Sequence, residues 1–270
     1  MRTPLLVAIL FTLTASGQDY LRDRGPGLPT SMFGTYIERG QLLVYPFVEY
    51  YRDKDFEYAP QELGFGLDED FRGEFHAREY LIFIGYGITD RLAVEFEAAY
   101  MDAEFKKAPD DPTGVPAQIK ESGLGDVEAQ LRWRVWEETT DRPELFGYFE
   151  TTFPLQKDKR IIGTSDWEYK AGAGMIKGFS FGTMTIRGAI EYSGEEGSAE
   201  IGEYAVEYLR RLSPRWRVYA GVEGVQDEIE LITEAQLHLS PRIFLKFNNA
   251  IGLTSKATDW APEVGIVFSF

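Results

Sequence analysis

The chain has 270 residues, with 44 Asp and Glu against 28 Lys and Arg, and it contains no cysteine. The acidic excess argues against a nucleic-acid partner, because phosphate binding depends on Lys and Arg. The absence of cysteine excludes a disulfide framework, a thiolate nucleophile and a Cys-ligated zinc site. The length suits one large domain, for which we predict no cofactor.

Residues 1–17 have the composition of a cleavable secretory signal. Arg2 precedes an apolar run over residues 5–13, and small residues follow at positions 15–17. A positive start, a short apolar run and a small-residue end are typical of an export signal. The alternative is a membrane anchor, but the run is too short to span a bilayer as a helix.

Residues 18–40 contain Gly or Pro at positions 25, 26, 27 and 29, which disfavour regular structure. We expect this segment either to remain in the periplasm or to enter the mouth of a barrel as a plug. Residues 41–270 then form the barrel itself.

From residue 41 onward, apolar and polar residues alternate in successive runs, which is typical of β-strands with one apolar face. Each run is close to the length that a tilted strand needs to cross a bilayer. We therefore predict an all-β fold, a transmembrane antiparallel up-and-down β-barrel of about 12 strands. The expected strands are residues 41–52, 73–88, 92–103, 125–136, 145–155, 167–178, 181–193, 201–212, 215–226, 229–239, 242–254 and 260–270.

The connections between these runs alternate in length. Short connections fall at residues 89–90, 179–180, 213–214 and 240–241, and long ones at 53–72, 104–122, 156–166, 194–200 and 255–259. Outer-membrane barrels alternate short periplasmic turns with longer external loops in this way. Residues 137–144 and 227–228 are exceptions, being long for a turn and short for a loop.

A soluble two-sheet sandwich or barrel in the periplasm is the alternative, because its strands also alternate. The runs are longer than ordinary globular strands, and Trp and Tyr recur near their ends. These features favour the outer membrane of a Gram-negative-type bacterium, with membrane lipid as a partner.

The last run, residues 260–270, ends on an aromatic residue. Val264, Ile266, Phe268 and Phe270 share one face of it. We predict that this strand closes the barrel against residues 41–52, and that Phe270 is an insertion signal recognised by the outer-membrane assembly machinery.

Residues 122–136 read SGLGDVEAQLRWRVW, and residues 85–92 read GYGITDRL. Together they resemble the outer-membrane β-barrel family labelled MetA-pathway of phenol degradation, in which a Gly-Leu-Gly-Asp at a strand start and a Gly-x-Thr-Asp turn recur. The resemblance implies a barrel with a transport role, but neither phenol as the substrate nor any catalytic residue. From the residues themselves, Gly123 and Gly125 permit a bulged strand start, and Asp126 can accept from exposed backbone N–H groups.

The chain has only two histidines, His76 and His238. We place His76 near the outer rim and His238 near the periplasmic end, and no serine pattern accompanies either. Nucleophilic catalysis needs a paired base, and zinc needs three or four ligands. We therefore predict no catalytic residue and no metal site.

Charged residues on the polar faces of the runs are expected to project into the lumen, where opposite charges should pair. One interpretation is a network that fills the barrel; the other is a narrow pore that orients a small polar or zwitterionic solute. The expected lumen-lining residues are Glu95, Glu97, Glu128, Arg132, Arg134, Glu150, Glu168, Lys170, Arg187, Glu191, Glu203, Glu207, Arg217, Glu223, Glu234, His238 and Lys246.

The external connections are acidic, which should concentrate cations at the mouth, whereas the periplasmic ends are comparatively basic. We predict a non-catalytic outer-membrane channel or transporter for a small solute. The alternatives are a closed structural or surface-interaction barrel and, less favoured, a barrel hydrolase.

Overall fold

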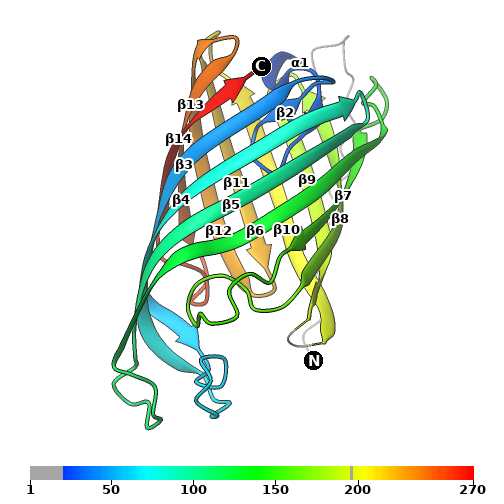
Figure 1. Ribbon diagram of the computed structural model, residues 1–270. Helices are drawn as coiled ribbons and strands as arrows, with labels where there is room; N and C mark the ends of the chain where they lie inside the picture. Colours follow the sequence, from blue (N-terminus) through cyan, green and yellow to red (C-terminus); the bar gives the residue numbers. More distant parts are fainter. Residues whose placement is uncertain (1–20, 195–196) are drawn as a thin grey trace, which may run out of the picture.

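The computed structural model describes residues 21–194 and 197–270, and in this part of the chain twelve antiparallel strands close into a barrel (Figure 1). Each strand pairs with its neighbours in sequence, and the last pairs with the first. This confirms the predicted up-and-down barrel. The strands are β3 Leu42–Tyr58, β4 Phe71–Thr89, β5 Leu92–Lys106, β6 Gln118–Trp136, β7 Glu144–Thr152, β8 Glu168–Phe179, β9 Gly182–Ser193, β10 Ser198–Arg211, β11 Trp216–Val225, β12 Glu228–Ser240, β13 Ile243–Gly252 and β14 Ala261–Ser269.

The barrel wall has an apolar outer face and a polar inner face. Val94 and Phe96 on β5 are exposed, whereas Glu95 between them is buried inside. The same alternation runs through β12, where Glu234 and Gln236 are buried. A hydrocarbon phase outside the barrel explains why the large apolar side chains face outward.

Exposed tryptophans lie at both ends of the wall. Trp136 and Trp216 lie at the end that carries the short turns, and Trp167 and Trp260 at the opposite end. Two such rings of aromatic residues are typical of the two membrane interfaces. We call the end with the short turns and the C-terminus periplasmic, and the other end external. In residues 21–194 and 197–270, no helix is long and apolar enough to cross a membrane.

The external ends of β3 to β6 extend beyond the other strands, at the lower end of Figure 1. The predicted loops at residues 53–72 and 104–122 were therefore too long, because parts of both continue the strands. A cluster of buried side chains explains the extension. Tyr58 and Phe105 pack edge to face with ring centroids 4.7 Å apart, and Leu63 joins them. Because these segments are rich in polar residues, their sequence pattern did not indicate a buried core.

The barrel closes where β14 meets β3, as predicted. Val264 lies opposite Val48, and Phe268 lies opposite Val44. Beyond the paired residues, the Phe270 N–H donates to the Leu42 carbonyl (2.9 Å), and the Leu42 N–H donates to the Phe270 carbonyl (3.1 Å). The Phe270 side chain is 69% exposed, so it contributes little to packing within the barrel.

Deletion of Phe270 is expected to lower the amount of folded barrel in the outer membrane severalfold. It removes two backbone hydrogen bonds at the seam together with an exposed terminal ring that assembly factors can reach. Heat-modifiable electrophoretic mobility of membrane fractions measures the folded protein. Phe270→Tyr is the matched control and should assemble normally. Unchanged membrane levels of the truncated chain would contradict the insertion role.

The described part of the N-terminal segment folds inside the periplasmic half of the barrel. Helix α1 (Leu21–Arg24) leads to β1 (Leu28–Pro29), which pairs with β2 (Tyr36–Ile37). We call residues 28–37 the lumen hairpin. The predicted secretory signal, residues 1–17, lies outside the described residues.

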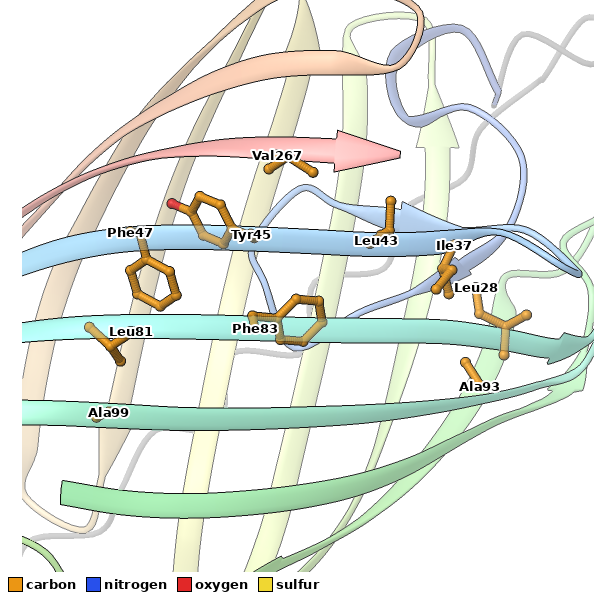
Figure 2. Packing of buried hydrophobic residues seen from close by; sticks show 10 residues of the cluster. All are labelled: Leu28, Ile37, Leu43, Tyr45, Phe47, Leu81, Phe83, Ala93, Ala99 and Val267. Atoms are coloured by element: carbon orange, nitrogen blue, oxygen red, sulfur yellow. The ribbon is translucent and has the colours of Figure 1, made fainter. Parts of the chain in front are cut away.

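The lumen hairpin packs on an apolar patch of the inner wall. Leu28 and Ile37 are 1% and 0% exposed, and they belong to the same cluster as Leu43, Tyr45 and Phe83 (Figure 2). Inward-facing apolar side chains would be costly in a water-filled lumen, and the hairpin covers them. The hairpin and this patch therefore form the hydrophobic core of the lumen.

Candidate functional site

Side chains of the barrel wall hold the tip of the lumen hairpin. The N–H and the hydroxyl of Ser31 both donate to Glu95 Oε2, at 2.9 and 2.6 Å. Lys246 Nζ donates to the Phe33 carbonyl (3.2 Å), and Gln236 Nε2 donates to the Gly34 carbonyl (3.3 Å). Because these groups come from β5, β12 and β13, the hairpin is attached across the width of the lumen.

A buried ionic cluster anchors the base of the hairpin at the periplasmic end. Glu144 Oε2 lies 2.8 Å from Arg24 Nη2 and 3.2 Å from Arg134 Nε. Arg134 also donates to the Gly27 carbonyl. Glu138, in the periplasmic loop, accepts from the Gly178 N–H at 2.8 Å and lies 3.2 Å from Lys177 Nζ.

Burial raises the pKa of Glu138, although the Gly178 N–H and the cations Arg24 and Lys177 act in the opposite direction. Removal of one member of such a cluster would leave a buried charge unpaired. The periplasmic base of the hairpin is therefore a tightly constrained part of the lumen.

A second network lies on the inner wall from β7 to β11. Arg187 pairs with Glu203, with Glu207 (2.6 Å) and with Glu223 (3.0 Å). Lys170 Nζ lies 2.7 Å from Glu150 Oε1. Nearby strands add two more pairs, Arg132 with Glu95 (3.4 Å) and Lys246 with Glu234 (2.9 Å). Opposite charges on facing strands thus pair in this part of the lumen.

The remaining expected lumen residues fall outside these pairs. Glu97 and Glu128 border a cavity beyond the hairpin tip. Arg217 and His238 border another cavity at the periplasmic mouth. Glu168 accepts from the Thr164 hydroxyl (3.2 Å) at the external end. Glu191, half-buried on β9, lies opposite Glu200 of β10. The two histidines stay apart: His76 lies 3.4 Å from the Tyr50 hydroxyl, and His238 stacks on Phe244.

The cavity beyond the hairpin tip has a volume of about 420 Å³, and we call it the acidic chamber. Lys246 lines it, as do the Phe33 and Tyr51 rings. Its carboxylates come from Glu49, Glu79, Glu97, Asp126, Glu128, Glu223, Glu230 and Glu263. Apart from Glu223, which pairs with Arg187, none of these eight forms an ion pair within 4 Å among the described residues.

Five of the chamber carboxylates were not predicted as lumen residues: Glu49, Glu79, Asp126, Glu230 and Glu263. Glu49 and Glu79 lie on inner faces that also carry Phe47 and Leu81, so these strands lack a uniformly polar face. Glu230 and Glu263 do lie on the polar faces recognised in the sequence. The alternation of apolar and polar residues could have identified those two as lumen residues. Glu49 and Glu79 could be assigned to the lumen only once the position of the hairpin was known.

An external loop, residues 153–167, joins β7 to β8 at the external end of the barrel (Figure 1). Its Ile162 is buried against Ala77 and Ala103. The Thr164 N–H donates to Asp126 Oδ1 at 2.7 Å. The Gly-Leu-Gly-Asp segment lies within β6 rather than at its start, at a bulge opposite residues 98–100. The bulge directs Asp126 toward the loop.

Substitution Asp126→Asn is expected to loosen this loop. It weakens one charge-assisted hydrogen bond, worth roughly 1 kcal/mol at an exposed site, so local opening should rise about fivefold. Limited trypsin digestion of the folded barrel measures the opening, because Lys159 and Arg160 lie in the loop. The exposed Asp166→Asn in the same loop is the control. Equal digestion of both variants would show that the bond does not hold the loop.

Solved structures with a similar fold are outer-membrane barrels. The COG4313 outer membrane channel from Pseudomonas putida F1 matches at a TM-score of 0.63 and 14% identity, covering 95% of this chain and 100% of the other. The translocator domain of the autotransporter NalP from Neisseria meningitidis has a TM-score of 0.53 at 12% identity, covering 86% and 88%. The NanC porin has a TM-score of 0.51 at 10% identity, covering 84% and 98%.

No family model matches the chain, and no curated protein matches it. The resemblance to the MetA-pathway family therefore stays a prediction. At these identities the structural likeness shows the fold alone, and channels share this fold with a translocator domain. The chain has the fold of the outer-membrane β-barrels.

Proposed function

We propose that this chain is a channel in the outer membrane that passes small solutes carrying a cationic group, without catalysis. The observation that carries the proposal is the acidic chamber beyond the hairpin tip. The similar structures include an outer membrane channel and a porin, so a channel role is one that this fold is known to serve.

The chamber suits a cation because, among the described residues, seven of its eight carboxylates form no ion pair within 4 Å. Glu49, Glu97, Glu128 and Glu263 all border it without an ion pair in the described part of the chain. Carboxylates held close together in a restricted space repel one another, and a cation entering between them relieves that repulsion. The Tyr51 ring on the same wall can contact an organic ammonium group through its face.

The width of the path is set by the lumen hairpin. An eight-stranded barrel is filled by its own side chains, and sixteen strands leave a wide channel. Twelve strands lie between these cases, and here the hairpin occupies part of the interior. A narrow path for small solutes follows from this combination.

The second candidate is a closed structural barrel, and the same hairpin favours it because Leu28 and Ile37 are fully buried against the wall. Conductance of the folded protein in planar lipid bilayers distinguishes the two. Ohmic openings are expected for the channel. The reversal potential in a KCl gradient should show that K⁺ passes more readily than Cl⁻. A correctly folded but silent barrel would support the closed structure, and a preference for Cl⁻ would contradict the cationic solute.

A further inference from the structure

A cavity of about 480 Å³ lies at the periplasmic mouth, on the other side of the lumen hairpin from the acidic chamber. Its walls are the hairpin residues Thr35 and Tyr36 and the ends of β10 to β14. We call it the mouth pocket. Three arginines line it, Arg211, Arg215 and Arg217, and among the described residues none of them forms an ion pair within 4 Å.

Carboxylates are scarce around the mouth pocket. Among the described residues that line it, the one carboxylate belongs to Glu38, which is exposed. Arg24 also lines the pocket but pairs with Glu144. Asp23 accepts from the Arg211 N–H (2.8 Å) and lies 3.8 Å from Arg210, so it is directed toward the backbone and a neighbouring side chain. The pocket is therefore positively charged in a chain of formal net charge −16.

Arg217 projects inward from β11 and is half-buried. Within residues 21–194 and 197–270, it forms no ion pair within 4 Å and no hydrogen bond. Arg211 Nε donates to the Ser213 carbonyl at 3.3 Å, and the positive charges of Arg211 and Arg217 repel each other. A guanidinium group has five N–H donors arranged to bind an oxyanion in two places at once. Arg217 thus offers donors that the protein itself leaves unused.

His238 provides an independent sign of a ligand. Its Nε2 atom is buried and, among the described residues, has no hydrogen-bond partner. The ring is fixed by stacking on Phe244, with centroids 4.7 Å apart, and it borders the same pocket. A buried polar atom without a partner costs free energy, which a bound group would recover.

We propose that the mouth pocket binds the oxyanion of a small soluble solute, a carboxylate or a phosphate group, between Arg211, Arg217 and His238. The pocket lies between the hairpin and the strand ends at the periplasmic mouth, so the anion we propose comes from solution rather than from lipid headgroups outside the wall. This site goes beyond the proposed channel function, because it concerns equilibrium binding of an anion. The cationic group of a zwitterion would meet carboxylates in the acidic chamber, and its anionic group would meet arginines here.

Isothermal titration of the folded full-length barrel, in an alkyl glycoside detergent at low ionic strength, tests the proposal. Citrate and orthophosphate are the two probes, and they separate carboxylate from phosphate preference. Saturable binding of at least one probe at one site per barrel is expected. Binding should weaken about tenfold in Arg217→Gln, since a bidentate charge-assisted contact is lost.

Arg91→Gln is the matched control, because it removes an exposed arginine from a periplasmic turn outside the pocket. It should bind the probes as the unmodified barrel does. Arg211→Gln is a second variant that keeps the backbone bond to Asp23, and it guards against misfolding of the Arg217 variant. Absence of saturable binding, or equal weakening in Arg91→Gln and the pocket variants, would overturn the proposal. This experiment does not measure conductance. A negative result would therefore contradict the anion site without contradicting the channel function.

Discussion

Deletion of residues 21–38, which removes the lumen hairpin, is expected to raise the single-channel conductance severalfold. The hairpin crosses the periplasmic half of the lumen and is attached to opposite walls through Ser31, Phe33 and Gly34. Without it, the ion path is limited by the wall side chains of a twelve-stranded barrel. Planar-bilayer recordings at symmetrical salt measure the change.

The same deletion should lower the thermal stability of the barrel. Leu28 and Ile37 are fully buried, and burial of each such side chain contributes about 1.5–3 kcal/mol. Heat-modifiable electrophoretic mobility identifies the folded fraction. The conductance and the melting temperature of the deletion variant are compared with those of the unmodified barrel for that fraction only.

Glu95→Ala is the graded control for this deletion, because it removes the acceptor of both Ser31 bonds while the hairpin remains. More frequent openings are expected, with a smaller increase in conductance than the deletion gives. If the deletion leaves the conductance of the folded barrel unchanged, the ion path does not pass the hairpin.

Most of the wall could be predicted from the sequence because its signals are local. In parts of β5 and β12, as in residues 94–97 and 234–239, apolar residues alternate with polar or charged ones, and the turns are marked by polar residues or proline. A strand between lipid and a polar lumen must alternate in this way, so the pattern identifies both the strand and its faces. The closure of β14 on β3 followed from the even number of strands.

The lumen was less predictable because the inner wall is apolar, rather than polar, where the hairpin packs on it. Leu43, Tyr45 and Phe47 face inward from β3, so that strand is apolar on both faces near its start. The local sequence pattern of β3 does not show that Leu28 and Ile37 of the lumen hairpin pack on its inner face. The chamber carboxylates Glu49 and Glu79 were missed for the same reason.

The triple substitution Glu97→Gln, Glu128→Gln and Glu263→Gln is expected to reduce the preference for K⁺ over Cl⁻ severalfold. These three carboxylates line the acidic chamber and have no ion pairs within the described residues, so their charge acts on the passing ion. Glutamine keeps their size and their ability to accept hydrogen bonds. The reversal potential in a tenfold KCl gradient measures the preference.

A matched triple substitution separates the chamber from the acidic external loops. Asp68, Glu69 and Asp70 are exposed in the loop between β3 and β4, and their conversion to Asn, Gln and Asn removes the same charge. The Debye length is about 3 Å in 1 M salt, so the loop charges are screened there, whereas charges inside a narrow lumen are screened much less. The chamber variant should therefore differ from the unmodified barrel even at high salt, and the loop variant only at low salt. If both variants shift the reversal potential equally at every salt concentration, selectivity depends on net charge rather than on the chamber.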